Sequence, residues 1–353
     1  MFQPTARGPP APSAYPPREG NNILDTVGPS WYSWATMTEK QQASFPKTLQ
    51  QAIVYFNNPD NALSFMISLR WPNGITCPRC GSDQHTFIST RRTWQCKNKE
   101  CKKMFTVKLG TLMEDSPIGL DKWLAAIWMI GGAKNGISSY EIHRALGITQ
   151  KSAWFLMHRI RLAMQTGTFE KLGGPGERVE ADETFIGGAA RFMHKNKKAE
   201  KIGTNTGFVG KTAVMGLLER GGQIKCKVIA GRRKHIIHEA VREDVAAGTE
   251  LLTDDLGSYR DLDEYIHKVV DHAVQYVVGH VHTNGLENFW SLLKRCLKGT
   301  YVSVEPFHLF RYLDEQSFRF NNRKVTDQVR FLAISQLIVG RRLTYKELTG
   351  KLG

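Results

Sequence analysis

The chain has 353 residues, 41% of them hydrophobic, so it can hold two or three domains with buried cores; it is neither a disulfide-stapled mini-protein nor wholly disordered. Its 48 Lys and Arg against 33 Asp and Glu give a formal net charge of +15, which favours a polyanionic partner such as nucleic acid over an acidic small molecule. Alternatively, the positive charge belongs to a well-solvated basic surface that has no such partner. Because the longest apolar runs are too short to span a bilayer, we expect a soluble protein.

The N-terminal residues have an unusual composition. Seven of the 14 prolines lie in the first 30 residues, and such a segment cannot pack a core. We therefore predict a disordered or misassigned arm over residues 1–44, with Met37 as an alternative start. An amphipathic stretch over residues 49–69 predicts a helical segment at 45–76.

Four of the six cysteines lie close together in the sequence. Their pattern is C-x2-C, fifteen residues, then C-x4-C, which is typical of a tetrahedral zinc site, and the four are Cys77, Cys80, Cys96 and Cys101. Alternating side chains between and after them predict three short strands, hence a zinc ribbon over residues 77–110. Four thiolates leave no open position for water, so the zinc is expected to be structural. Alternatively, the four cysteines are incidental buried residues that bind no metal.

Residues 116–168 are predicted to form a helix-turn-helix segment. Ser138 or Ser139 can cap the first of two helices, Gly147 supplies the turn between them, and Thr149 can cap the second. The early residues of that helix would face a DNA groove, and we expect Lys151 and Arg159 to contact DNA. Residues 77–168 hold 14 Lys and Arg against 6 Asp and Glu, the most basic part of the chain per residue. Helix pairs with a glycine corner also occur in proteins that never bind DNA.

An acidic strand is predicted after a flexible Gly-Gly-Pro-Gly break. Alternation over residues 178–188 places Glu180, Asp182 and Thr184 on one face. A hairpin over 211–230, turned at two glycines, suggests three consecutive antiparallel strands. Alternatively, these carboxylates are solvated residues on an exposed strand face.

Two further carboxylates complete a possible metal site. Asp254 ends a short apolar strand, and Glu287 lies near the start of a predicted helix. With Asp182 they could hold two magnesium ions, the arrangement used for in-line displacement at phosphorus. From the residues alone, Asp254 could instead cap a following helix, and Asn284-x-x-Glu287 fits a capping box equally well. His280 and His282 offer a weaker, metallohydrolase alternative.

Several long motifs in this order resemble a known family. They are Arg70-Trp-Pro-Asn-Gly-Ile-Thr-Cys-Pro-Arg-Cys80, Val179-Glu-Ala-Asp-Glu-Thr-Phe-Ile-Gly-Gly188, Gly210-Lys-Thr-Ala-Val, Thr253-Asp254 with Tyr259, His282-Thr-Asn-Gly-Leu-Glu-Asn-Phe-Trp-Ser-Leu-Leu-Lys-Arg295 and Arg311-Tyr-Leu-Asp-Glu315. From about Phe45 onward the chain resembles the DDE insertion-sequence transposases that carry an N-terminal zinc ribbon and a ribonuclease-H-like core, the bacterial relatives of the Merlin transposases.

The resemblance implies roles for particular residues. Asp182, Asp254 and Glu287 would be the three catalytic carboxylates, and Lys294, further along one helical face, would touch DNA. Some relatives use an asparagine for the third role, so Asn284 is a rival to Glu287. The neighbouring Glu183 and Asp255 could be mistaken for the matched positions.

The expected fold class is multidomain α/β. It comprises the zinc ribbon, the helix-turn-helix segment, a ribonuclease-H-like mixed-sheet core over residues 176–330 and a C-terminal tail over 331–353.

We expect a transposase that binds terminal inverted repeats, cleaves their ends with two magnesium ions and joins them to target DNA, as at least a dimer. It would be cytoplasmic and nucleoid-associated if bacterial, or nuclear if eukaryotic. A non-catalytic DNA-binding regulator and a ribonuclease-H-like repair nuclease are the alternatives.

Overall fold

The computed structural model describes residues 45–165, 171–188, 210–270 and 283–350. In these ranges the α-helices are α3 (Leu49–Asn57), α4 (Pro59–Arg70), α5 (Leu120–Gly132), α6 (Ser139–Leu146), α7 (Gln150–Met164), α9 (Lys234–Asp244), α10 (Asn284–Gly299), α11 (Leu309–Asn321), α12 (Asp327–Gln336) and α13 (Tyr345–Thr349). The strands are β1 (His85–Ile88), β2 (Thr93–Cys96), β3 (Met104–Phe105), β4 (Arg178–Ile186), β5 (Thr212–Glu219), β6 (Ile224–Ile229), β7 (Glu250–Asp254) and β8 (Ile266–Val270).

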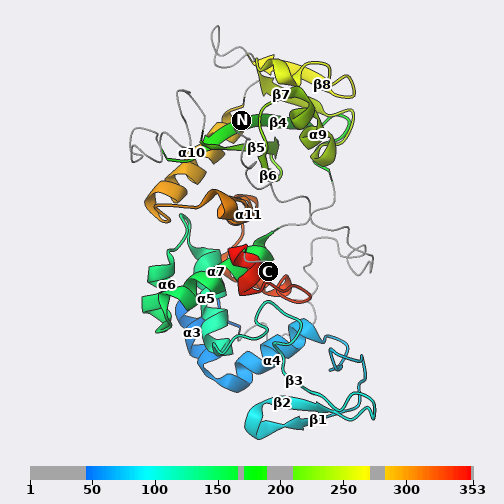
Figure 1. Cartoon of the computed structure of the whole chain (residues 1–353), viewed down its shortest axis with the longest axis vertical. Helices are drawn as coiled ribbons and strands as arrows, with labels where there is room; N and C mark the ends of the chain where they lie inside the picture. The colour runs from blue at the N-terminus through cyan, green and yellow to red at the C-terminus, as the bar shows by residue number, and fades with distance from the viewer. Residues whose placement is uncertain (1–44, 166–170, 189–209, 271–282, 351–353) are drawn as a thin grey trace, which may run out of the picture.

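Figure 1 shows two regions joined through the middle of the molecule. The sheet of β4 to β8 lies in one region with α9 and α10, while α3 to α7 and the small sheet of β1 to β3 lie in the other. Helix α11 packs against both β6 and α7, so it joins the two regions. The predicted arm over residues 1–44 and the residues His280 and His282 lie outside the described ranges. No helix in those ranges is long and apolar enough to cross a membrane.

The predicted zinc-ribbon strands are confirmed. β1, β2 and β3 form an antiparallel sheet in sequence order, with Trp94 opposite both Phe87 and Phe105. The rings of Trp94 and Phe105 stack with centroids 5.7 Å apart, and Trp71 packs edge-on against both. Because so few apolar groups are buried here, the sheet needs further support from its cysteines.

The amphipathic stretch near the N-terminus forms two helices. The side chain of Asn58 accepts a hydrogen bond from the backbone N–H of Asp60, and Pro59 occupies the first position of α4. These two residues, Asn58 and Pro59, separate α3 from α4. Both helices pack with α5 and α12 around a core rich in aromatic rings, where Phe331 stacks on Phe65 at 5.5 Å. Residues beyond 330, predicted as a tail, therefore contribute the rest of α12 and all of α13 to the N-terminal core.

The helix pair α6–α7 begins and ends as its sequence predicts. Ser138 and Glu141 form a capping box at the start of α6, and Thr149 caps α7. Gly147 between them has φ 58°, a left-handed conformation that favours glycine. Beyond its first turn, α7 is buried on most of its surface against neighbouring helices.

The larger sheet has mixed topology. Within the described residues its strand order is β6-β5-β4-β7-β8; β4, β5 and β6 are consecutive antiparallel strands, as predicted, and β7 and β8 run parallel to β4. One face is covered by α9 with the segment around Tyr259, and the other by α10 and α11. The chain is therefore a small three-stranded ribbon and a helical region joined to a mixed α/β domain with a central sheet.

Candidate metal centre and candidate active site

The four cysteines of the ribbon converge. Their sulfur atoms all lie within 4.8 Å of one another, with Cys77 Sγ 3.9 Å from Cys101 Sγ and Cys80 Sγ 3.6 Å from Cys96 Sγ. Zinc–sulfur bonds of about 2.3 Å imply a sulfur–sulfur separation of about 3.8 Å around a tetrahedral ion. The donor set and its spacing thus fit the structural zinc that the sequence predicts.

Local turns bring these thiols together. In the first knuckle the backbone N–H of Gly81 donates to the carbonyl of Cys77 at 2.8 Å, and in the second the N–H of Cys101 donates to the carbonyl of Asn98 at 3.1 Å. Cys96 closes β2, so the sheet register fixes the distance between the knuckles. The site is therefore specified almost entirely by local sequence.

Asp182 lies near the middle of β4, on the face covered by α10. It is opposite Gly216 of β5, where an added Cβ would lie 2.7 Å from the ring of Trp290. The missing side chain lets the Trp290 indole of α10 approach the strand closely, and its Nε1 donates to Asp182 Oδ2 at 2.9 Å. Gly216 and Trp290 together hold both the carboxylate and the helix in place.

Glu180 is buried on the same face, only 2% exposed, and anchors the start of α10. Its Oε2 accepts a hydrogen bond from the backbone N–H of Leu286 at 3.0 Å, and its Oε1 lies 3.2 Å from Nε of Arg220. A carboxylate at a helix N-terminus satisfies an otherwise unpaired N–H and interacts favourably with the helix dipole. Glu180 is therefore a positioning residue and not a solvated strand residue.

Asp254 and Glu287 lie beside Asp182. Asp254 ends β7, the parallel neighbour of β4, while Glu287 is exposed in the first turn of α10. Burial raises the pKa of Asp182, and the negative charges of Asp254 and Glu287 raise it further. Across the described ranges, however, only the cysteines form a close group of three or more potential metal ligands.

The sequence also allowed Glu287 and Asp254 to act only as local caps, and the structure treats the two residues differently. Thr283 is the N-cap of α10 and its own side chain makes no capping hydrogen bond, so the predicted capping box between Asn284 and Glu287 is absent. Asp254 Oδ1 does accept a hydrogen bond from the backbone N–H of Leu256 at 3.2 Å, a turn contact before the short helix Gly257–Tyr259. That bond leaves the second carboxylate oxygen of Asp254 for another ligand.

The opposite face of β4 carries a pair that the sequence did not single out. The buried hydroxyl of Tyr259 donates to Oε1 of Glu183. Burial raises the pKa of Glu183 to about 7, and the charges of Asp182 and Asp254 add to the effect. Strand alternation places Glu183 on the face of β4 opposite to Asp182, and this alternation is the sequence feature that could have pointed to the pair.

The three residues predicted to bind DNA have different surroundings. Lys151 is exposed in the first turn of α7, and Lys294 is exposed on α10. Arg159, in contrast, is 6% exposed; its guanidinium donates to the carbonyls of Leu343 at 3.1 Å and Glu114 at 2.9 Å. The expectation that Arg159 contacts DNA is thus not supported, because its donors are used inside the protein.

The fold and the cysteine cluster define a class: a zinc-ribbon protein with a separate mixed α/β domain. A family model described as a transposase zinc-ribbon domain matches residues 57–104, and one described as an ISXO2-like transposase domain matches residues 171–321. The chain belongs to the ISXO2-like insertion-sequence transposases.

Two curated relatives agree with this assignment. An uncharacterized transposase-like protein of Haemophilus influenzae is 31% identical over 123 residues, which is 33% of this chain and 98% of the relative. An uncharacterized protein in transposable element ISH50 of Halobacterium salinarum is 25% identical over 255 residues, covering 69% of this chain and 84% of the relative.

Proposed function

We propose that the protein is a DNA transposase that binds the terminal inverted repeats of its element, cleaves phosphodiester bonds at the ends and joins them to target DNA. The observation that supports the proposal is that three carboxylates come from neighbouring elements: Asp182 from β4, Asp254 from the end of its parallel neighbour β7, and Glu287 from the first turn of α10, which packs on β4. Trp290 donates to Asp182, and the backbone N–H of Leu286 donates to Glu180, so the first turns of α10, which carry Glu287, are held against β4.

In this proposal Asp182, Asp254 and Glu287 hold magnesium ions, since carboxylate oxygens are the ligands that magnesium prefers. Bound magnesium would supply activation of the attacking oxygen and charge stabilisation of the leaving oxygen. The chain's own contribution is positioning: Trp290 fixes the orientation of Asp182, and the N–H of Leu256 fixes that of Asp254.

The finer fold assignment belongs to the same proposal. The sheet order, with three antiparallel strands followed by two strands parallel to the first, supports a ribonuclease-H-like core over residues 176–330. The capped helices α6 and α7 support a helix-turn-helix over 116–168, in which exposed Lys151 faces DNA and Arg159 stabilises the helix. Lys294 would contact DNA beside the carboxylates. Synapsis of two ends requires at least a dimer.

The test compares Asp182→Asn, Asp254→Asn and Glu287→Gln in magnesium-dependent cleavage of DNA that carries the element's ends. Asparagine keeps an acceptor for Trp290, and Glu287 is exposed, so we expect near-native melting temperature and end binding with cleavage lost. Glu239→Gln, an exposed glutamate on α9, is the matched control and should cleave normally.

Asn284→Ala discriminates the two assignments of the third role. If Glu287→Gln cleaves normally and Asn284→Ala does not, the role belongs to Asn284. A wild-type protein that binds the ends but never cleaves them would instead be a DNA-binding regulator.

A further inference from the structure

The pairing between β4 and β7 ends just before their two carboxylates. The last registered pair joins Glu180 of β4 to Leu252 of β7. Asp182 and Asp254 each lie two positions further along their strands. Beyond the last pair, β4 continues its pairing with β5, and β7 continues its pairing with β8. The β4–β7 ladder therefore does not itself hold Asp182 and Asp254 at a fixed separation.

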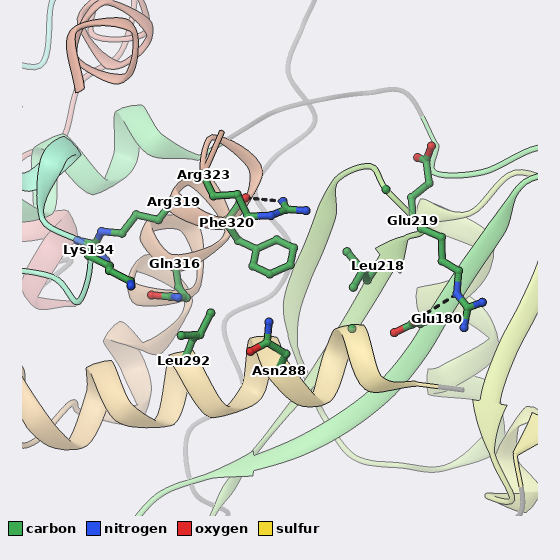
Figure 2. Close-up of a pocket in the computed structure, with 13 residues that line it drawn as sticks. Lys134, Glu180, Leu218, Glu219, Asn288, Leu292, Gln316, Arg319, Phe320 and Arg323 are labelled. Atoms are coloured by element: carbon green, nitrogen blue, oxygen red, sulfur yellow. Dashed lines mark hydrogen bonds and ion pairs between the residues drawn. The ribbon is translucent and has the colours of Figure 1, made fainter. Parts of the chain in front are cut away.

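On the β4 side, α10 holds the first carboxylate. Glu180 lies beside the start of α10, at the wall of a cavity (Figure 2), and accepts the backbone N–H of Leu286 at 3.0 Å. About one turn further along the helix, Trp290 donates to Asp182 at 2.9 Å. These contacts fix Asp182 relative to α10, and they leave its separation from Asp254 to other groups.

On the β7 side, a tight turn carries the second carboxylate. The backbone N–H of Leu256 donates to Asp254 Oδ1 at 3.2 Å, and the N–H of Tyr259 donates to the carbonyl of Leu256 at 3.0 Å. Ser258 Oγ donates to the carbonyl of Arg232 at 2.6 Å, which ties the same turn to the segment before α9. Asp254 and Tyr259 therefore belong to one hydrogen-bonded unit.

The side chain of Tyr259 connects this turn to β4. Its ring is fully buried in the core between the sheet and α9, and its hydroxyl donates to Oε1 of Glu183, the residue after Asp182. Packed core side chains keep one rotamer, so the buried ring is a rigid link. One hydrogen bond thus joins the turn of Asp254 to the residue next to Asp182.

We propose that Tyr259 is a positioning residue for the carboxylate site. Through Glu183 it holds the turn of Asp254 at the separation from Asp182 that a shared magnesium site needs. The inference rests on the proposed function, because the site is the one assigned there to these two carboxylates and Glu287. Tyr259 itself touches neither metal nor DNA. Groups that hold metal ligands from outside typically change metal affinity or activity by about 10- to 100-fold when they are removed.

Magnesium binding to the full chain, measured by calorimetry, tests the proposal. Tyr259→Phe removes only the hydroxyl and should weaken magnesium binding about tenfold or more. The matched control is Tyr265→Phe, because the Tyr265 ring is buried in the same core and its hydroxyl donates to the carbonyl of Val245 at 3.2 Å. The control should bind magnesium as the wild type does. Each variant loses one hydroxyl hydrogen bond, so their melting temperatures should fall to a similar extent.

Glu183→Gln separates the hydrogen bond from the charge of Glu183. Glutamine keeps an acceptor oxygen for the Tyr259 hydroxyl, so this variant should bind magnesium with close to the wild-type affinity. A loss as large as that of Tyr259→Phe would assign the effect to the charge of Glu183 and overturn the proposal. Equal magnesium binding by Tyr259→Phe and Tyr265→Phe would overturn it as well.

Cleavage of DNA that carries the element's ends gives a readout that a purely structural role would not change. In Tyr259→Phe, binding to the ends should be unchanged and excess magnesium should restore cleavage, because the metal ligands themselves remain. Asp182→Asn lacks a ligand and should not be restored. Cleavage by Tyr259→Phe that stays low at saturating magnesium would contradict a role in holding the ligands.

The two proposals fail separately. If Asp182→Asn binds magnesium as tightly as the wild type, the carboxylate site of the proposed function is wrong, and the positioning role falls with it. If Asp182→Asn loses magnesium binding and Tyr259→Phe does not, only the positioning role is wrong. Amide hydrogen exchange of residues 254–260 without added magnesium tests the link itself. It should be faster in Tyr259→Phe than in Tyr265→Phe, and equal exchange would show that the hydroxyl does not hold the turn.

Discussion

His158 shows how a single residue can make stability depend on pH. Its ring is fully buried on α7, and neither ring nitrogen has a hydrogen-bond partner among the described residues. Burial lowers the pKa of His158 to about 2, and the positive charges of Arg161, His308 and Arg311 lower it further. Tyr312 also packs against the ring, at 5.7 Å. The histidine is therefore neutral in the folded protein.

This environment predicts an acid-labile fold. The unfolded chain binds a proton at His158 as the pH falls through the ordinary histidine value near 6.5, whereas the folded chain does not. Stability is thus complete above that pH and decreases below it, by about 2 kcal/mol at pH 5. Denaturant titrations at pH 7 and pH 5 measure the difference. His158→Gln should lose this part of the pH dependence, and a variant as acid-sensitive as the wild type would contradict the assignment.

At the scale of one element, we expect the zinc ribbon to depend on bound zinc for its stability. Its own core is little more than Trp94, Phe105 and their neighbours, so Cys80→Ser should lose about one zinc per chain and unfold the β1–β3 sheet. Metal analysis of the purified protein measures the zinc, and near-ultraviolet circular dichroism, to which Trp94 contributes, measures the unfolding. Cys226→Ala, outside the cluster, should keep its zinc. Wild-type zinc content in Cys80→Ser would refute the four-thiolate site.

Helix α7 has an exposed first turn, and the rest of it is mostly buried. A substitution in the first turn should therefore affect DNA binding, and one in the buried part should affect stability. Lys151→Gln should weaken binding to element ends and reduce the salt slope by about 1, as one phosphate contact is lost. Arg159→Gln should instead lower the melting temperature, because the carbonyls of Leu343 and Glu114 lose the hydrogen bonds that the guanidinium donates. Salt-dependent binding and thermal melting separate the outcomes. An unchanged slope in Lys151→Gln would place the DNA surface elsewhere.

At the scale of the whole molecule, a buried charge network joins the two regions. Glu315 of α11 accepts a hydrogen bond from Nε of Arg161 of α7 at 2.6 Å, and it also pairs with Arg319 and the hydroxyl of Tyr301. The guanidinium of Arg161 lies 4.1 Å from the ring centroid of Tyr312. The proposed DNA-binding helix α7 is thus linked directly to α11, which covers one face of the larger sheet.

Glu315→Gln should therefore destabilise the protein by about 3 kcal/mol or more, because it leaves two buried guanidinium groups without their counterion. Denaturant unfolding at neutral pH measures the loss. The exposed control Glu239→Gln should change stability by less than about 0.5 kcal/mol. Equal stability of the two variants would show that the network does not hold the regions together.

The features that the sequence by itself determined are local. The cysteine spacing, the caps at Ser138 and Thr149 and the alternation of β4 each depend on residues a few positions apart, so helical and strand periodicity were sufficient to locate them. The order of the three antiparallel strands was equally accessible, because a glycine turn joins β5 to β6.

The tertiary structure decided the features that join distant parts of the chain. Arg159 meets a carbonyl 184 residues away, Glu180 anchors a helix 106 residues away, and Trp290 fills the space above Gly216. The periodicity of a segment shows which face is apolar, but not what covers it, because burial and hydrogen bonding depend on the partner surface. For that reason a predicted DNA contact proved to be a core arginine, and an apparent surface carboxylate proved to hold the start of α10 in place.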